Sequence, residues 1–186
     1  DLHERNLAIP KLNPKNVFNA AKDVTVDGLD AVVVHDSDGI VIKAFPVDHS
    51  KWPHAYGYQI NYKGKRIVIS GDTTPSEGIL KYSKNADILI HEALNMPLIK
   101  LVGNKLDELD GPISSKQLKK IADVHTSTLD LAHIAQKAGV KKLVLTHLIP
   151  AIPSVWIAER FFTAGMDDIY NGDIVVSRDG EWLSVD

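Results

Sequence analysis

Four apolar segments of this chain each end in a residue whose side chain can bind a metal ion or move a proton. These residues are His49, Asp72, His91 and His147. In α/β proteins the carboxyl ends of strands meet at one sheet edge, where rigid strands and open loops place ligands and catalytic groups. We therefore expect several of these side chains to converge on one site.

Asp72 directly follows a buried apolar run, so it either caps the next helix or binds something. Thr74 at the N-cap, Pro75 at the first helical position and Glu77 at the third form a capping box. A second cap at Asp72 would be redundant. Gly71 before it lets the backbone turn sharply and approach a neighbour closely. We therefore interpret Asp72 as a ligand.

His125 stands just before the N-terminus of a helix expected over 127–139. A histidine there could donate a proton to a leaving group or stabilise developing negative charge. For His147 and His91, a hydrogen-bonded core or loop histidine is the simpler interpretation when each is taken alone. Glu92 could orient a neighbouring ligand from behind, or it could bond a surface loop.

The hydrophobic pattern predicts the elements that must position these residues. Two short strands are expected within 23–34, strands at 40–49, 86–90 and 141–148, a hairpin at 56–70, helices at 74–84, 114–124 and 127–139, and a final hairpin at 172–185. Strands alternate with helices in the middle of the chain, and hairpins flank both ends. This order predicts an α/β layered domain with a mixed sheet covered by helices.

The composition limits the classes of function. The chain has 186 residues and no cysteine, so it can form one domain, and a transition-metal site would need histidine and carboxylate ligands. Its net charge of -3 lacks the overall positive charge that is typical of proteins that bind nucleic acid. No apolar run approaches the ~18 residues of a membrane span. Neither nucleic acid nor a membrane is therefore expected as a partner. The absence of cysteine fits either redox compartment, so the location stays open, with the cytoplasm as the default expectation.

Five segments in order along the chain resemble the metallo-β-lactamase superfamily, and within it the tRNase Z and arylsulfatase-like branch. They are FPVDHS and AYGYQI within 45–60, IVISGDT at 67–73, ADILIHEA at 86–93, HTSTLDLAHIA at 125–135 and KKLVLTHL at 141–148. The resemblance implies a four-layer αββα sandwich that holds two metal ions at one edge of its paired sheets. The ions are usually zinc, with manganese or iron as alternatives.

The resemblance also implies roles for four residues. His49 matches a histidine ligand of one metal, Asp72 the carboxylate that bridges both ions, and His147 a histidine ligand of the second. His125 matches the histidine that tRNase Z-type members use as a proton donor or oxyanion stabiliser. In such enzymes a metal-bridged hydroxide attacks an ester centre.

One departure from the family concerns the ligand set. The His-x-His-x-Asp-His cluster, which the family places upstream, is absent. We therefore expect 23–186 to be the C-terminal part of a single metallo-β-lactamase-like domain and 1–22 to be a linker that leads into it. The N-terminal half would come from the same gene or from a partner chain.

A second departure concerns the substrate. The tRNA-gripping arm that tRNase Z carries between the segments matching His49 and Asp72 is replaced here by a hairpin. A small ester substrate is therefore favoured over tRNA. Residues that follow His49 are candidate substrate contacts, although an exposed loop explains them equally well: Lys51, Trp52, His54 and Tyr56. The segment 94–124 is interpreted as a pocket wall or as a contact in a homodimer.

Three functions remain in competition. The first is a zinc-dependent hydrolase acting on a sulfate ester, a phosphate ester or a lactone. The second is a tRNA 3′-processing endonuclease, which would bind RNA with strong salt dependence. The third is a non-catalytic subunit that acts only by binding a partner.

Overall fold

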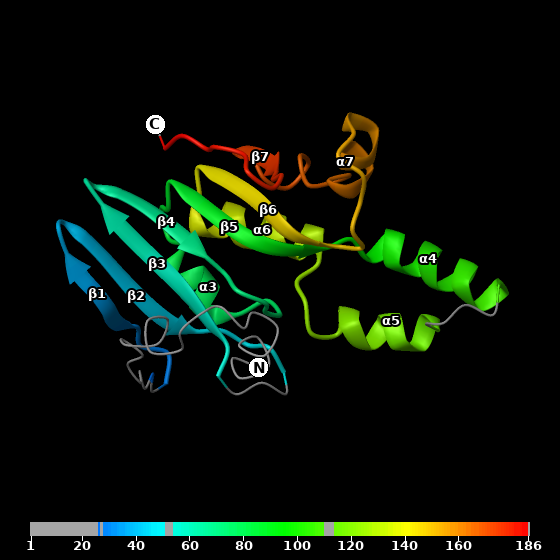
Figure 1. Ribbon diagram of the computed structural model, residues 1–186, viewed down its shortest axis with the longest axis horizontal. Coiled ribbons are helices and arrows are strands. Elements are labelled where there is room, and N and C mark those ends of the chain that lie inside the picture. The colour runs from blue at the N-terminus through cyan, green and yellow to red at the C-terminus, as the bar shows by residue number, and fades with distance from the viewer. Residues whose placement is uncertain (1–25, 27, 51–53, 110–113, 186) are drawn as a thin grey trace, which may run out of the picture.

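The structure, a computed structural model, describes residue 26 and residues 28–50, 54–109 and 114–185. Within these residues one mixed sheet contains seven strands that lie in the order of the sequence (Figure 1). The strands are β1 Val32–Ser37, β2 Ile40–Pro46, β3 Tyr56–Tyr62, β4 Lys65–Ile69, β5 Ile88–Leu94, β6 Lys142–Ile149 and β7 Asp173–Val176. The helices are α3 Glu77–Tyr82, α4 Met96–Glu108, α5 Ser115–Ala122, α6 Thr128–Ala138 and α7 Trp156–Phe162.

The sheet changes character at β4. Strands β1 to β4 form an antiparallel meander, whereas β4, β5, β6 and β7 run parallel to one another. Parallel strands require crossover connections, and here the segments containing α3, α4 to α6, and α7 supply them. The carboxyl ends of β4, β5 and β6 therefore lie at the same edge. This edge is where the sequence predicted a site.

One face of the sheet carries the main hydrophobic core. Helices α3 and α6 lie behind the sheet in Figure 1 and pack on this face. Leu89 of β5 and Leu143 of β6 are fully buried against Leu131 of α6, and Phe162 of α7 belongs to the same cluster. Burying an aliphatic or aromatic side chain of this size contributes roughly 1.5–3 kcal/mol. This core fixes the strands whose ends form the site.

The opposite face of the sheet is also apolar. Ile42, Ile60, Ile67 and Ile90 share this face through the strand register and are partly buried. Neither hydrophobic cluster of the described residues includes them. The described residues therefore build two layers of the predicted four-layer sandwich, a sheet and the helices on one of its faces.

Helix α6 confirms the sequence-based prediction in detail. Ser127 is the N-cap, and its side chain accepts a hydrogen bond from the backbone N–H of Asp130. Gly139 closes the helix in the left-handed conformation. Leu131 and Ala135 point into the core, as their spacing predicted. The loop that holds His125 is therefore anchored by a well-defined helix start.

The predicted capping box at Thr74 is wrong. Helix α3 begins two residues later, and Ser76 is its N-cap, with its Oγ accepting from the backbone N–H of Ile79 at 3.1 Å. Thr74 instead bonds the backbone carbonyl of Asp48 through both its N–H and its hydroxyl. The propensity of Thr-Pro at a helix start is overridden by this contact with a neighbouring loop. Asp72 is still not the cap.

Other elements differ from the prediction at the ends of the chain. β1 extends beyond the strands expected within 23–34, to Ser37, and only Asp38 and Gly39 form the turn to β2. The final hairpin lacks its second strand, and β7 pairs in parallel with β6 instead. Helices α4 and α7 were not predicted individually. In the part of the chain that the structure describes, we find no helix with the length and apolar character needed to cross a membrane.

Candidate active site

Three side chains that are far apart in the sequence meet beyond the carboxyl ends of the parallel strands. Asp72, His125 and His147 each offer a ligand atom, and these atoms lie within 4.8 Å of one another. Asp72 follows β4, His125 precedes α6, and His147 lies in β6. The fold therefore gathers three of the residues that the sequence singled out.

Asp72 owes its position to Gly71. Gly71 has a φ of 64°, and a Cβ at this position would lie 2.7 Å from the backbone oxygen of Tyr56. Only glycine fits such a left-handed turn against a neighbouring backbone. The side chain of Asp72 is 43% exposed, and its Oδ1 lies 3.7 Å from Nδ1 of His147. The close approach predicted for Gly71 is confirmed.

A β-bulge positions His147. Glu92 of β5 pairs with Thr146, whereas the next residue of β5, Ala93, pairs with Leu148, so His147 is the extra residue in β6. Its φ of 44° is rare for a residue with a side chain. Bulges re-aim side chains and are common beside active sites. The side chain of His147 is 55% exposed, so it is not the buried core histidine that was the simpler interpretation.

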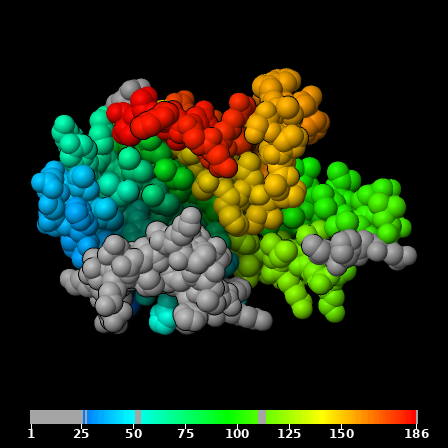
Figure 2. Space-filling model, viewed as in Figure 1, coloured from blue at the N-terminus to red at the C-terminus, as the bar shows by residue number. Residues whose placement is uncertain are grey.

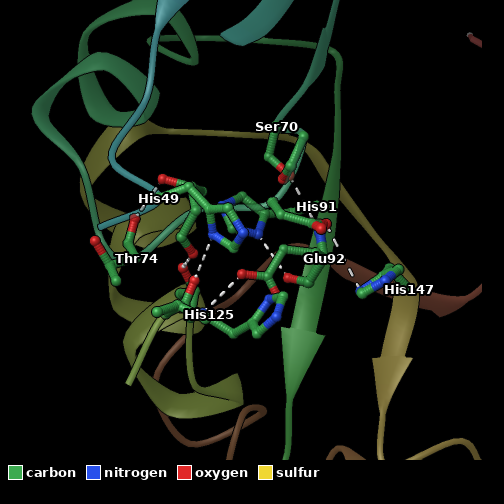
Figure 3. A network of polar contacts seen from close by, with 12 residues as sticks. His49, Ser70, Thr74, His91, Glu92, His125 and His147 are labelled. Carbon is green, nitrogen blue, oxygen red and sulfur yellow. Dashed lines mark hydrogen bonds and ion pairs between the residues drawn. The ribbon is translucent and has the colours of Figure 1, made fainter. Parts of the chain in front are cut away.

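Glu92 holds the imidazole of His125 from behind (Figure 3). Its Oε2 lies 3.4 Å from Nδ1 of His125, and its Oε1 accepts a hydrogen bond of 2.7 Å from the backbone N–H of Thr126. Its side chain is 1% exposed. Glu92 is therefore buried rather than at the surface; it bonds the loop before α6 through Thr126 and also lies against His125.

The ionisation of this pair follows from its burial. Burial raises the pKa of the Glu92 carboxyl to about 8 and lowers the pKa of His125 below its usual value. At pH 7 the carboxyl therefore keeps its proton while the imidazole is neutral. Oε2 of Glu92 and Nδ1 of His125 face each other at 3.4 Å without a hydrogen bond, and neither buried atom has another hydrogen-bond partner among the described residues.

Threonine contacts join the loops around the site. The hydroxyl of Thr126 donates to the backbone oxygen of Thr73 at 2.7 Å, which connects the loop before α6 to the loop after β4. The hydroxyl of Thr73 accepts from the backbone N–H of Asp48 at 3.1 Å, which connects the loop after β2. Thr73 and Thr126 are both fully buried. These contacts hold His49, Asp72 and His125 in a fixed relation.

His49 lies beside the three-residue cluster. Its ring centroid is 5.4 Å from that of His125, and its Nδ1 donates to the backbone oxygen of Val124 at 2.9 Å. This bond orients the ring and places a proton on Nδ1. His49 is not part of the close cluster of Asp72, His125 and His147. Its role as a ligand remains a prediction.

His91 lies within β5, immediately before Glu92, rather than at the strand end. It is fully buried, and its Nδ1 donates to the backbone oxygen of Glu92 at 2.6 Å. Burial lowers the pKa of His91 to about 4, so the ring is neutral at physiological pH. These contacts agree with the structural interpretation of this histidine.

A cavity of about 550 Å³ opens beside His49 and His125. Lys120 and Asp123, at the end of α5, also line it, although the sequence did not point to them. The lysine-rich polar face of the predicted helix 114–124, which ends directly before His125, was the signal that could have identified them. Of the predicted substrate contacts, Lys51 and Trp52 lie outside the described residues, and His54 and Tyr56 are not in the lining.

The donor set fits a metal ion. Imidazole nitrogen and carboxylate oxygen are ligands that zinc, iron and manganese accept. Around Asp72, His125 and His147 the atoms are close enough for a common ion, and the Glu92 contact to His125 resembles the carboxylate support common behind metal-site histidines. The ligand chemistry therefore agrees with the predicted metal centre without selecting the metal.

Curated relatives of the chain come from mycobacteria. Ribonuclease Z of Mycobacterium avium (strain 104) is 31% identical over 119 residues, which make up 64% of this chain and 39% of that protein. Putative ribonuclease Z of Mycobacterium tuberculosis (strain CDC 1551 / Oshkosh) is 32% identical over 117 residues, which make up 63% of this chain and 47% of that protein. The matched part is less than half of each relative. No family model matches the chain.

Solved structures with a similar fold also exceed this chain in length. The metallo-β-lactamase fold protein YhfI from Bacillus subtilis aligns with a TM-score of 0.54 at 19% identity, over 82% of this chain and 51% of that one. The short form of human tRNase Z aligns with a TM-score of 0.52 at 22% identity, over 84% of this chain and 46% of that one. At such low identity these alignments establish a shared fold and no more.

Proposed function

Because this chain belongs to the metallo-β-lactamase superfamily and is ribonuclease Z-like, we propose that it forms one side of the active site of a metal-dependent ester hydrolase. The observation that carries the proposal is the convergence of Asp72, His125 and His147, whose ligand atoms lie within 4.8 Å of one another beyond the carboxyl ends of the parallel strands. The α/β fold predicted from the sequence is confirmed in part, as one sheet with its helices. Fold alone would not specify the reaction.

The metal ligands in this proposal are Asp72, His147 and His49. Asp72 would act as the bridging carboxylate, a role that its exposed side chain, 3.7 Å from Nδ1 of His147, supports. When bound, the metal supplies Lewis acidity and a water activated for attack at neutral pH. Zinc is the expected ion. Further ligands would come from the upstream His-x-His-x-Asp-His half, in the same gene product or in a partner chain.

His125 acts as the proton donor or oxyanion stabiliser in this proposal. In this proposal the protonated carboxyl of Glu92, 3.4 Å from Nδ1, donates to that nitrogen and leaves the imidazole proton on Nε2. A neutral imidazole N–H held in this way can stabilise negative charge on a non-bridging oxygen or protonate the leaving alkoxide. Glu92 acts through His125 and is a positioning residue.

Phosphate esters are the substrate class that we favour, with RNA as a specific candidate. The relatives are named ribonucleases, so the expectation from net charge that nucleic acid is excluded as a partner lacks support. A small sulfate or phosphate ester, or a lactone, remains the alternative, because the described residues between His49 and Asp72 contain only the β3–β4 hairpin. A non-catalytic subunit is the third candidate.

The decisive test is an activity screen of the protein loaded in turn with zinc, manganese and iron. The substrates are bis(4-nitrophenyl) phosphate, 4-nitrophenyl sulfate, a homoserine lactone and a transfer RNA precursor with a 3′ extension. We expect metal-dependent hydrolysis of a phosphodiester. Metal binding without hydrolysis of any substrate, also after addition of the upstream half of the fold, would support the non-catalytic subunit and refute the proposal.

A further inference from the structure

Helices α4 and α5 form a hairpin that extends past the edge of the sheet, at the right of Figures 1 and 2. Its buried cluster joins Ile99 of α4 and Leu118 of α5 to Leu94 at the end of β5. A Cβ on Gly103 of α4 would lie 3.2 Å from the Cα of Ser115, so the two helices approach closely. The hairpin is therefore a packed unit attached directly to the strand that carries Glu92.

Four lysines on this hairpin form a group that we name the lysine row. Its members are Lys100 on α4 and Lys116, Lys119 and Lys120 on α5. All four are exposed. Among the described residues none of them has an ion-pair partner, whereas the nearby Lys105 pairs with Glu108 at 2.8 Å. Within the described part of the hairpin, the positive charge of the row is therefore not neutralised by an ion pair.

The lysine row lines a path that leads from the candidate active site. Lys120 lies in the cavity of about 550 Å³ that contains His49 and His125. The other three lysines of the row line a second cavity of about 560 Å³ between α4 and α5. Asp123 lines both cavities, so they adjoin, and it is the single carboxylate opposing four ammonium groups in the described lining.

We propose that the lysine row binds successive phosphate groups of an oligonucleotide chain whose scissile ester lies at Asp72, His125 and His147. This rests on the proposed function, because it assigns the substrate class of the same site. Lys116 and Lys120 are one helical turn apart, about 6 Å along the axis of α5, and Lys100 of α4 lines the same cavity as Lys116 and Lys119. The lysines are therefore spread over a distance larger than one phosphate group, so a single phosphate cannot contact all of them. Lysine binds phosphate as a point charge, so contact with the backbone requires no particular base sequence.

The test measures binding of a fluorescein-labelled single-stranded RNA of twelve nucleotides and mixed sequence by anisotropy. The full chain is used with a chelator present, so that no cleavage occurs, between 50 and 200 mM NaCl. The triple variant K116Q/K119Q/K120Q removes most of the row. The matched control K63Q/K84Q/K137Q makes the same change in net charge at exposed positions on the opposite edge of the sheet.

We expect the row variant to bind at least tenfold more weakly and the control to stay within twofold of the wild type. Each lost phosphate contact lowers the slope of log affinity against log salt by about 0.7 for a single strand, so the slope should fall by about 2. Equal weakening by both triple variants would overturn the proposal, because it would assign binding to net charge alone. Absence of RNA binding by the wild type at 50 mM NaCl would overturn it as well.

Two further measurements distinguish failure of the RNA-binding proposal from failure of the proposed hydrolase function. Inorganic phosphate at matched ionic strength should compete with the RNA only weakly; competition as strong as that of unlabelled RNA would identify a small anion as the ligand and contradict the proposal. Hydrolysis of bis(4-nitrophenyl) phosphate by the metal-loaded protein tests the premise by itself. If that hydrolysis is absent while the row variant loses RNA affinity, the proposed function fails and the binding surface stands.

Discussion

At the scale of single residues, the site depends on groups whose ionisation is set by burial. Glu92 is fully enclosed yet faces His125, so its carboxyl keeps a proton at neutral pH and its charge does not compete with Asp72 for a cation. Asp72 and His147 remain exposed and available for ligands. The protein thus places a neutral positioning pair behind two accessible ligand residues.

Replacing Asp72 and His125 separately should distinguish a ligand from a proton donor. We expect Asp72→Ala to lose both bound metal and activity, because a bridging carboxylate is removed. His125→Ala should keep the metal and lower turnover by about 10²–10⁴-fold, the usual contribution of general acid catalysis. Inductively coupled plasma spectrometry and steady-state kinetics measure the two effects.

The same pair of variants can contradict the assignment. Asp72→Asn serves as the control that keeps the volume of the side chain. His125 lies within 4.8 Å of both other ligand atoms, so equal metal loss in Asp72→Ala and His125→Ala would show that His125 is itself a ligand.

Glu92 should make the stability of the protein fall as pH rises. The pKa of its carboxyl is about 8 in the folded state, above its value of 4.5 when solvated, so between these values the folded state binds the additional proton. Between pH 6.5 and 8, the free energy of unfolding should drop by about 1–2 kcal/mol. Urea unfolding with a chelator present measures this drop.

Glu92→Gln is the matched variant, because the amide keeps the shape and can still accept from Thr126. Its free energy of unfolding should be nearly flat over the same range. His91 has the opposite effect, since its pKa of about 4 makes stability rise with pH only below 6.5. A wild-type slope retained in Glu92→Gln would locate the titrating group elsewhere.

At the scale of elements, strand ends and short loops place the site. The turn at Gly71 aims Asp72, the bulge at His147 aims that histidine, and the N-terminus of α6 fixes the loop of His125. The buried hydroxyls of Thr73 and Thr126 connect these loops. Rigid elements with bonded connections give the positional precision that catalytic groups require.

Gly71→Ala should be more destabilising than an ordinary glycine replacement at positive φ. At Gly71 the added methyl would meet the backbone oxygen of Tyr56 at 2.7 Å, whereas at Gly64, with φ of 77°, nothing lies within 4 Å. We expect Gly64→Ala to cost about 1 kcal/mol and Gly71→Ala at least about 2 kcal/mol, with weaker metal binding. Thermal unfolding and metal titration of both variants measure this, and equal losses would show that the close contact is relieved by movement.

At the scale of the whole molecule, the described residues form a sheet that is apolar on both faces but has helices on one. The partly buried isoleucines of β2 to β5 form a surface that agrees with sheet-on-sheet packing. Relatives and fold neighbours are about twice the length of the matched part or longer. We propose that the upstream half of the fold, carrying the remaining ligands, covers this surface.

The apolar sheet face should be detectable in solution. We expect the chain by itself to bind the dye ANS and to self-associate with increasing concentration, because large apolar patches are interaction sites. Ile60→Glu with Ile67→Glu should reduce both effects. Leu101→Glu with Leu129→Glu, at apolar positions that are exposed on helices, is the control with the same added charge. A chain that stays monomeric and does not bind ANS would contradict this expectation.

The sequence by itself determined the start and end of α6, the need for glycine before Asp72, and most of the strand–helix order between β2 and β6, because these depend on local pattern. Tertiary structure alone decided that Ser76 rather than Thr74 caps α3, since a backbone contact from Asp48 occupies Thr74. It also decided that Glu92 is buried against His125 and that the lysines of α5 adjoin the site. These contacts join residues that are far apart in the sequence, and a local sequence pattern does not show which distant residues will meet in the fold.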